Sequence, residues 1–240
     1  MLPTAPPFFS AIRRNVFEFF MLFLAVWLAF ATDYLREETE KQDREERYMR
    51  SMRKDLMRDT VQLSELTARF DWKRRGLDSL LVLFGTSAER FPAAGYGMMQ
   101  RQLSGFPDFI PADATLRQLK EAGGLQLIDD EECVSGILRY DAAVQGELMH
   151  QEAMNEFLLG RLWERHARSL DLLAMADAAR RNFAPPLPRI LLSSAPDEHI
   201  RFRNDVVQYR TLVLLQLNII GALKADAAAL LTLLRERYPE

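Results

Sequence analysis

An almost uninterrupted apolar run, VFEFFMLFLAVWLAFA at 16–31, is followed directly by the charged stretch TDYLREETEKQDREER. At about 1.5 Å per residue the run covers roughly 24 Å, a little less than a hydrocarbon core of about 30 Å. Tyr34 and Leu35 extend the apolar length at the far end. The sequence therefore predicts one transmembrane helix over 16–35, preceded by a short tail over 1–15.

Six residues are the expected contacts between this helix and the membrane. The two arginines can reach the headgroups, and the three aromatic residues lie toward the far interface, where amphipathic rings are favoured. The glutamate lies inside the span, where a central carboxylate costs about 2.5–3.5 kcal/mol. Three roles stay open for it: snorkelling or protonation, a contact with another helix or a ring in an oligomer, and ion translocation. The six are Arg13, Arg14, Glu18, Trp27, Phe30 and Tyr34.

A cleaved signal peptide is the main alternative, because Ala29-Phe30-Ala31 matches an A-x-A cleavage site. However, the apolar run is longer than an ordinary signal sequence, and no polar region precedes Ala31. A helical pattern without Pro or Gly continues from Leu35 to Gly76. These features favour a retained anchor. Lys and Arg flank both ends of the run, and the closer pair at the short end weakly favours a cytoplasmic N-terminus.

Composition excludes several classes of protein. The net charge of −3 and pI near 5.8 leave no basic surface for nucleic acid, and no nucleic-acid-binding motif is present. A hydrophobic content of 48% with 10% aromatic residues is too high for an intrinsically disordered chain. The lone Cys133 allows no disulfide within the chain, so it fits an oxidising compartment without requiring one.

Beyond the membrane, apolar residues recur every seven positions. A second row, three residues after alternate members, is interrupted by Asp59 and Lys73. This is the a/d pattern of a helix with one apolar seam, expected over 36–85 with Gly85 as its stop. We call the main row the heptad residues: Met49, Leu56, Leu63, Phe70, Leu77 and Phe84.

Two uses fit this seam: packing within the chain, or a parallel coiled coil between chains. The large side chains of Phe70, Trp72 and Phe84 favour packing within the chain as a helical bundle.

The remaining chain divides into a connecting region and a helical domain. Prolines and glycines punctuate 86–112, so only a short helical piece is expected there. The domain at 113–240 begins with a short helix, and its next helix is capped by Asp129 or Asp130. That helix should run to near residue 181 with a break around Gly160. A proline-rich loop follows, then a last helix that reaches the C-terminus. Because no run alternates with a strand period, we predict an all-α fold.

No arrangement of side chains points to catalysis, a metal or a cofactor. The three histidines do not have metal-ligand spacing: they are His150, His166 and His199. His166 lies in the Arg-rich sequence WERHARS, so we expect its side chain to be solvated. The acidic run at 129–132 lacks the spacing and glycine of a calcium loop and fits helix capping. Cys133 fits a buried small residue. We therefore expect no enzyme.

Three features occur together: Glu18 near the start of the span, the polar-aromatic exit DYLREE leading into a charged helix, and the unit TLRQLKEAGGLQLI. In this combination the chain resembles a family of bacterial single-pass membrane proteins, catalogued as domain of unknown function six-zero-nine-zero. In that family the exit typically reads NNWNE, and the span is more aliphatic and contains glycine. The resemblance implies a short cytoplasmic N-terminus and an extracytoplasmic helical domain in the bacterial inner membrane. It supplies no catalytic residues.

The leading hypothesis is a membrane-anchored, non-enzymatic helical module that binds a partner or senses a signal at the cell envelope. Its groove would lie between the seam helix and the last helix. The second is a homo-oligomeric assembly, in one form a pore, that uses Glu18 and the seam helix. A third is an enzyme built from dispersed carboxylates such as Asp129, Asp130 and Asp141. Membrane lipid and a protein partner or second copy are the expected partners.

Overall fold

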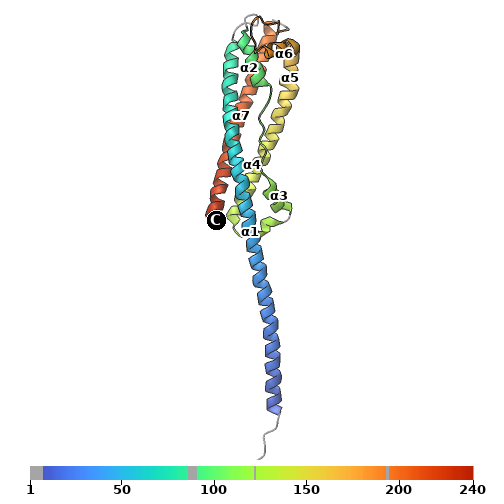
Figure 1. Cartoon of the computed structure of the whole chain (residues 1–240), viewed down its shortest axis with the longest axis vertical. Coiled ribbons are helices and arrows are strands. Elements are labelled where there is room, and N and C mark those ends of the chain that lie inside the picture. The colour runs from blue at the N-terminus through green and yellow to red at the C-terminus, as the bar shows by residue number, and fades with distance from the viewer. Residues whose placement is uncertain (1–7, 86–90, 122, 193–194, 240) are drawn as a thin grey trace, which may run out of the picture.

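A single helix of 76 residues, α1 (Phe8–Leu83), dominates the molecule. The computed structural model describes residues 8–85, 91–121, 123–192 and 195–239. At about 1.5 Å per residue α1 is roughly 114 Å long. Its N-terminal half, blue in Figure 1, extends alone, and its C-terminal half lies beside the rest of the chain. No Pro or Gly occurs between Phe8 and Gly76, so nothing in the sequence interrupts the helix.

The helix begins earlier than the predicted tail over 1–15 allows. No Pro or Gly follows Phe8 until Gly76, so the sequence has no helix breaker over 8–15. The side chains of 8–16, which include Arg13 and Arg14, lie outside the described part of the structure.

Two further long helices pack with α1. The first is α4 (Glu131–Glu156), and the second is α7 (Pro196–Arg237), which runs along both α1 and α4. Figure 1 shows α7 side by side with the upper half of α1. The sequence predicts this last helix from near Asp197 to Tyr238, and α7 agrees with both bounds to within a residue. The apolar face of α7 that the sequence indicated is buried: Phe202, Val206, Tyr209, Val213, Ile220, Leu223, Leu230 and Leu234.

Shorter helical pieces complete the chain. Every regular element within the described ranges is helical, and the only pairing of extended backbone there is an isolated bridge between Leu170 and Leu191. The all-α prediction is therefore confirmed for these residues. The pieces are α2 (Ala93–Leu103), α3 (Ala114–Glu121), the 3₁₀ turn η2 (Gly124–Leu127), the π-helix η3 (Phe157–Leu162), α5 (Trp163–Ser169) and α6 (Leu172–Arg180).

The break expected around Gly160 lies elsewhere. The π-helix η3 carries the chain through Gly160 without interruption, and the helix stops at Leu170. Asp171 then caps α6, its side chain accepting a hydrogen bond from the N–H of Ala174 at 2.9 Å. The π-helix changes the rotation of the side chains after it, because it holds more residues per turn than an α-helix. The sequence pattern also predicts an apolar stripe along this helix, and three of its leucines are instead exposed: Leu138 before the π-helix, Leu159 within it and Leu173 after it.

All six heptad residues are buried, with exposed fractions of 0–2%. They belong to the same core cluster as the buried face of α7. Phe70 packs edge-on against Phe106, with ring centroids 4.7 Å apart. Trp72, which the sequence grouped with Phe70 and Phe84, is instead 49% exposed. Two residues after Phe70, its side chain is about 200° away around the helix and misses the seam.

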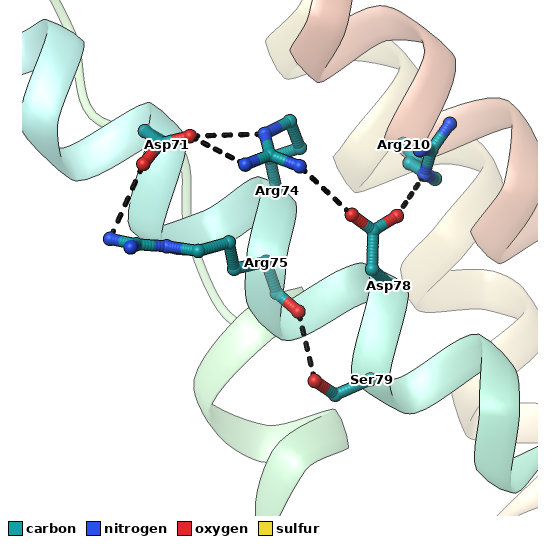
Figure 2. A network of polar contacts seen from close by, with 6 residues as sticks. All are labelled: Asp71, Arg74, Arg75, Asp78, Ser79 and Arg210. Carbon is teal, nitrogen blue, oxygen red and sulfur yellow. Dashed lines mark hydrogen bonds and ion pairs between the residues drawn. The ribbon is translucent and has the colours of Figure 1, made fainter.

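A partly exposed network of charges also connects α1 to α7 (Figure 2). Arg74 bonds Asp71 at 2.8 Å and Asp78 at 3.0 Å on α1. Arg75 adds a contact to Asp71 at 3.3 Å, and Arg210 of α7 donates from Nε to Asp78. Because such exposed pairs each stabilise by about 1 kcal/mol or less, the apolar core supplies most of the attachment between the two helices.

Candidate functional site

The first candidate site is the apolar segment at the N-terminal end of α1. Twelve large apolar side chains between positions 17 and 35 are exposed, and they point to every side of the helix. A helix that is apolar all round is normally buried in a large core or in a membrane. We call this stretch the apolar segment. Its large exposed members are Phe17, Phe19, Phe20, Met21, Leu22, Phe23, Val26, Trp27, Leu28, Phe30, Tyr34 and Leu35.

Two helices within the described ranges are long and apolar enough to cross a membrane, α1 and α7. They differ in their surroundings. No part of the apolar window of α1 is covered by the rest of the chain, whereas the window of α7 is partly buried against α1 and α4. Gln216 in that window is fully buried and bonds Glu147 of α4. The apolar character of α7 is therefore explained by its packing, and that of α1 is not.

The predicted anchor residues lie along this segment. Trp27, Phe30 and Tyr34 are well exposed, at the end nearer the folded domain. Glu18 is also exposed, near the other end. The charged helix continues directly from the segment, and Arg44 pairs with Glu40 there at 3.7 Å.

The end of the folded domain nearest the apolar segment is held by polar contacts. Lys41 bonds Asp129 at 2.6 Å, only about 9 Å along the helix from Leu35. Asp130, not Asp129, caps α4, accepting from the N–H groups of Glu132 and Cys133. Arg237 from the end of α7 bonds Asp130 at 3.1 Å and Glu132 at 2.9 Å. The acidic run at 129–132 is therefore used for capping and ion pairs.

Asp59 interrupts the second row of the seam, yet it is buried, with 2% of its surface exposed. Its carboxylate accepts hydrogen bonds from the N–H of Ala112 at 2.8 Å and from the hydroxyl of Tyr140 at 2.8 Å. Burial raises the pKa of Asp59, while these two bonds act against that rise. One turn earlier, Asp55 accepts from both the N–H and the hydroxyl of Thr115. The carboxylates on α1 therefore fasten the start of α3 and the chain before it.

Lys73, the other interruption, is buried in the same way. Its ammonium donates to the carbonyl oxygens of Gln102 and Gly105, both at 2.7 Å, and lies 5.5 Å from the ring centre of Tyr209. Burial lowers the pKa of Lys73 to about 8. It satisfies the carbonyl groups at the end of α2, which would otherwise lack partners. Both interruptions of the seam thus bind the connecting region.

A further buried pair joins α4 to α7. Glu147 and Gln216 are both fully buried, and the Gln216 amide donates to Glu147 Oε1. Burial raises the pKa of Glu147 to about 7. Glu147 Oε2 and Gln216 Oε1 have no partner among the described atoms. A proton on the carboxyl would let it donate to the amide oxygen in return, so the neutral acid fits this position better than the anion does.

The three histidines lie in separate surroundings. His199 contacts the carbonyl of Phe84 at 3.2 Å, and His166 packs edge-on against Phe202. The expectation of a solvated His166 is wrong: burial lowers its pKa to about 4. Cys133 is fully buried, as expected, and burial raises its pKa to about 11.

The dispersed carboxylates do not form one site. Asp141 bonds Lys120, whereas Asp129 and Asp130 lie about 16 Å away along α4. Within the described ranges no three His, Cys, Asp or Glu side chains are grouped so as to hold a metal ion.

Replacing Asp59 with Leu tests the polar interruption of the seam. Leu would complete the apolar row, yet we expect a loss of about 2–4 kcal/mol in the free energy of unfolding. The N–H of Ala112 and the hydroxyl of Tyr140 would both be buried without an acceptor, at about 1–3 kcal/mol each. Chemical denaturation of the full chain measures this. Adding Tyr140→Phe should recover part of the loss; a stabilised Asp59→Leu protein would contradict the role of the carboxylate.

Comparisons with known proteins add no relative. No family model matches the chain, and neither a curated protein nor a solved structure matches it. The resemblance to the family of unknown function therefore stays a prediction.

Proposed function

We propose that this protein is a membrane-anchored, non-enzymatic helical module, whose extramembrane helices form a bundle that binds a partner or senses a signal at the bacterial cell envelope. One observation carries the anchoring part: the apolar segment exposes large side chains on every side of α1. Covering a Leu or Phe side chain is worth about 1.5–3 kcal/mol. Twelve such side chains favour a hydrocarbon environment by well over 10 kcal/mol in total.

The position of the folded domain supports the same proposal. Lys41, about two turns beyond Leu35, already bonds Asp129 of the domain. With the apolar segment in a bilayer, the near end of the domain lies next to the headgroup region. The rest of the domain extends away from the membrane along α1 (Figure 1). We place the short N-terminus in the cytoplasm and the domain outside the inner membrane, following the resemblance and the arginines near the N-terminus.

Paired substitutions with Lys test the anchor. Leu22→Lys with Val26→Lys places two charges in the middle of the segment, at about 2.5–3.5 kcal/mol each on insertion scales. We expect a carbonate wash to extract this variant from the membrane fraction. The matched control is Val61→Lys with Val82→Lys, two exposed positions on α1 inside the folded domain. That protein should stay in the carbonate-washed membrane.

The same preparations separate an anchor from a cleaved leader. Intact mass of the membrane-bound protein should include the apolar segment. A mature chain that begins at Thr32 and remains soluble after lysis would overturn the proposal. Reporter fusions at either end measure sidedness, and crosslinking in native membranes captures partners.

A homo-oligomeric assembly or pore is the second candidate, and Glu18 favours it. Its carboxylate lies within the exposed apolar segment, where a charge in hydrocarbon is costly and a contact with a second copy would reduce that cost. The heptad residues, however, are buried within one chain and offer no surface to a second copy. Mass measurement in detergent distinguishes the two, because a monomer excludes the pore.

A further inference from the structure

A cavity of about 500 Å³ lies at the end of the molecule opposite the apolar segment. Residues of α2, α5 and α6 line it, and Figure 1 shows these three helices gathered at that end. Its volume falls within the roughly 300–1,000 Å³ typical of small-molecule sites. Nothing in the site described above uses it.

The floor of the cavity is part of the core, and its walls are not. Met99, Leu103 and Leu170 at the floor are almost fully buried, whereas Trp163 and Leu172 on the walls are 45% and 52% exposed. The Trp163 indole is fixed in place, because its N–H donates to the carbonyl of Leu103 at 3.3 Å. A molecule in the cavity would cover a rigid aromatic ring and an aliphatic side chain that now face water. Burial of such surface favours an apolar occupant.

Among the described residues, the lining includes no Asp, Glu, Lys or Arg, although 27% of the chain is charged. The charged residues of α5 and α6 are engaged outside it. Arg165 bonds Asp205 of α7 at 2.9 Å, and Asp177 pairs with Arg180 at 3.4 Å. Arg168 bonds Glu164 along α5. A charged ligand would therefore lose its hydration in the cavity without gaining a counter-charge.

A few polar groups remain at the cavity. The side chains of Gln100 and Ser104, at the end of α2, are exposed on its edge. They can donate to or accept from one polar group of a ligand. His166, also in the lining, stays uncharged at neutral pH because burial depresses its pKa to about 4. The described lining is thus apolar with a neutral polar edge.

The cavity exists because the helix after α4 is irregular. The π-helix η3 immediately precedes Trp163, and the extended backbone at Leu170 separates α5 from α6. Two backbone hydrogen bonds hold the chain at this break. The N–H of Asp171 donates to the carbonyl of Ile190 at 2.8 Å, and the N–H of Leu192 donates to the carbonyl of Ser169 at 3.0 Å. Single π-helical turns inside α-helices occur frequently at functional sites.

We propose that this cavity binds an uncharged, mainly apolar small molecule that carries one polar end group, with the apolar part against Trp163 and Leu172 and the polar group at Gln100 and Ser104. The ligand arrives from the aqueous side. The floor residue Leu103 lies next to Gln102, whose carbonyl bonds Lys73, about 57 Å along α1 from Leu35. An acyl chain of the same bilayer cannot reach that height. The proposal does not depend on whether the apolar segment anchors the chain.

Two single-tryptophan proteins provide the test, because bromine quenches indole fluorescence on contact. Trp27→Phe with Trp72→Phe leaves Trp163 as the fluorophore; Trp27→Phe with Trp163→Phe leaves Trp72. Trp72 is 49% exposed and lies outside the cavity, so it is a matched control for Trp163. Each full-length protein, in lipid nanodiscs, is titrated with bromo-octanol and separately with bromo-octanoate.

We expect bromo-octanol to quench the fluorescence of Trp163 in a saturable manner and that of Trp72 only weakly, by collision. Bromo-octanoate should bind at the cavity at least tenfold more weakly than bromo-octanol. Ala176→Phe, at an exposed position of the lining, should abolish the saturable part without disturbing the core. Equal quenching of both tryptophans would overturn the proposal. So would saturable quenching that survives Ala176→Phe, or tighter binding of the anion. Membrane association of the same proteins is recorded separately, so a failed anchor and a failed cavity give different results.

Discussion

Phe70→Ala is expected to lower the free energy of unfolding by about 3–5 kcal/mol, the range for removing a buried aromatic ring. Phe70 is fully buried at the middle of the heptad row and packs edge-on against Phe106. Its removal leaves a cavity among α1, α7 and the connecting region, which the long helices cannot close without moving. Denaturation of the full chain, followed by helical circular dichroism, measures the loss.

Trp72→Ala is the matched control, because it deletes a larger ring only two positions away. With 49% of its side chain exposed, Trp72 leaves no closed cavity, and we expect a change below about 1 kcal/mol. Similar losses for the two variants would contradict the register of α1 and would favour a seam that faces a second chain.

The second large effect concerns pH. Burial raises the pKa of Glu147 to about 7, above the ordinary value of a glutamate in the unfolded chain. Between these two values the folded chain keeps a proton that the unfolded chain has lost. The stability supplied by Glu147 is therefore complete at low pH and is lost as the pH rises through about 7. We expect this residue to lower the free energy of unfolding by roughly 1–3 kcal/mol between about pH 5 and pH 8.

Glu147→Gln removes the titration and keeps the shape of the side chain. The difference in stability between the variant and the natural protein isolates the Glu147 contribution, because other groups titrate in both. His166 is one such group, with its pKa lowered to about 4 by burial, and it acts in the opposite direction at acidic pH. If the difference stays constant from about pH 5 to pH 8, the buried carboxyl is not the cause.

The parts of the fold that the sequence predicted best are those set by one periodic pattern. The heptad row from Met49 to Phe84 specifies which side of α1 is buried, and the row on α7 specifies its partner face. Each row follows one regular helix over many turns, so a count of residues is sufficient. Trp72 shows the limit, because aromatic character alone does not place a side chain on the seam.

The polar interruptions illustrate what a single pattern cannot give. Asp59 and Lys73 looked like defects of the seam, but each binds backbone groups that lie tens of residues further along the chain. Which N–H or carbonyl would lack a partner depends on how the connecting region is folded. The only signal in the sequence was that both interruptions were charged residues at apolar positions.

The cavity was not predictable either. Its lining comes from three short helices, and their placement depends on the π-helix η3 and the break at Leu170. A π-helix has no residue signature as strong as that of proline or glycine, so the pattern placed the break at Gly160. The apolar segment of α1, by contrast, was evident from composition alone.

The unbroken course of α1 has a mechanical consequence. From Leu35 to Leu83 the helix extends about 72 Å. It contains no Pro over this length, and its first Gly is Gly76, so we expect it to be stiff. Single spans tilt by about 20° on average, and such an inclination would carry the far tip roughly 25 Å sideways. With the apolar segment spanning a bilayer, as proposed, bilayer thickness would influence this tilt and thereby the area that one molecule sweeps.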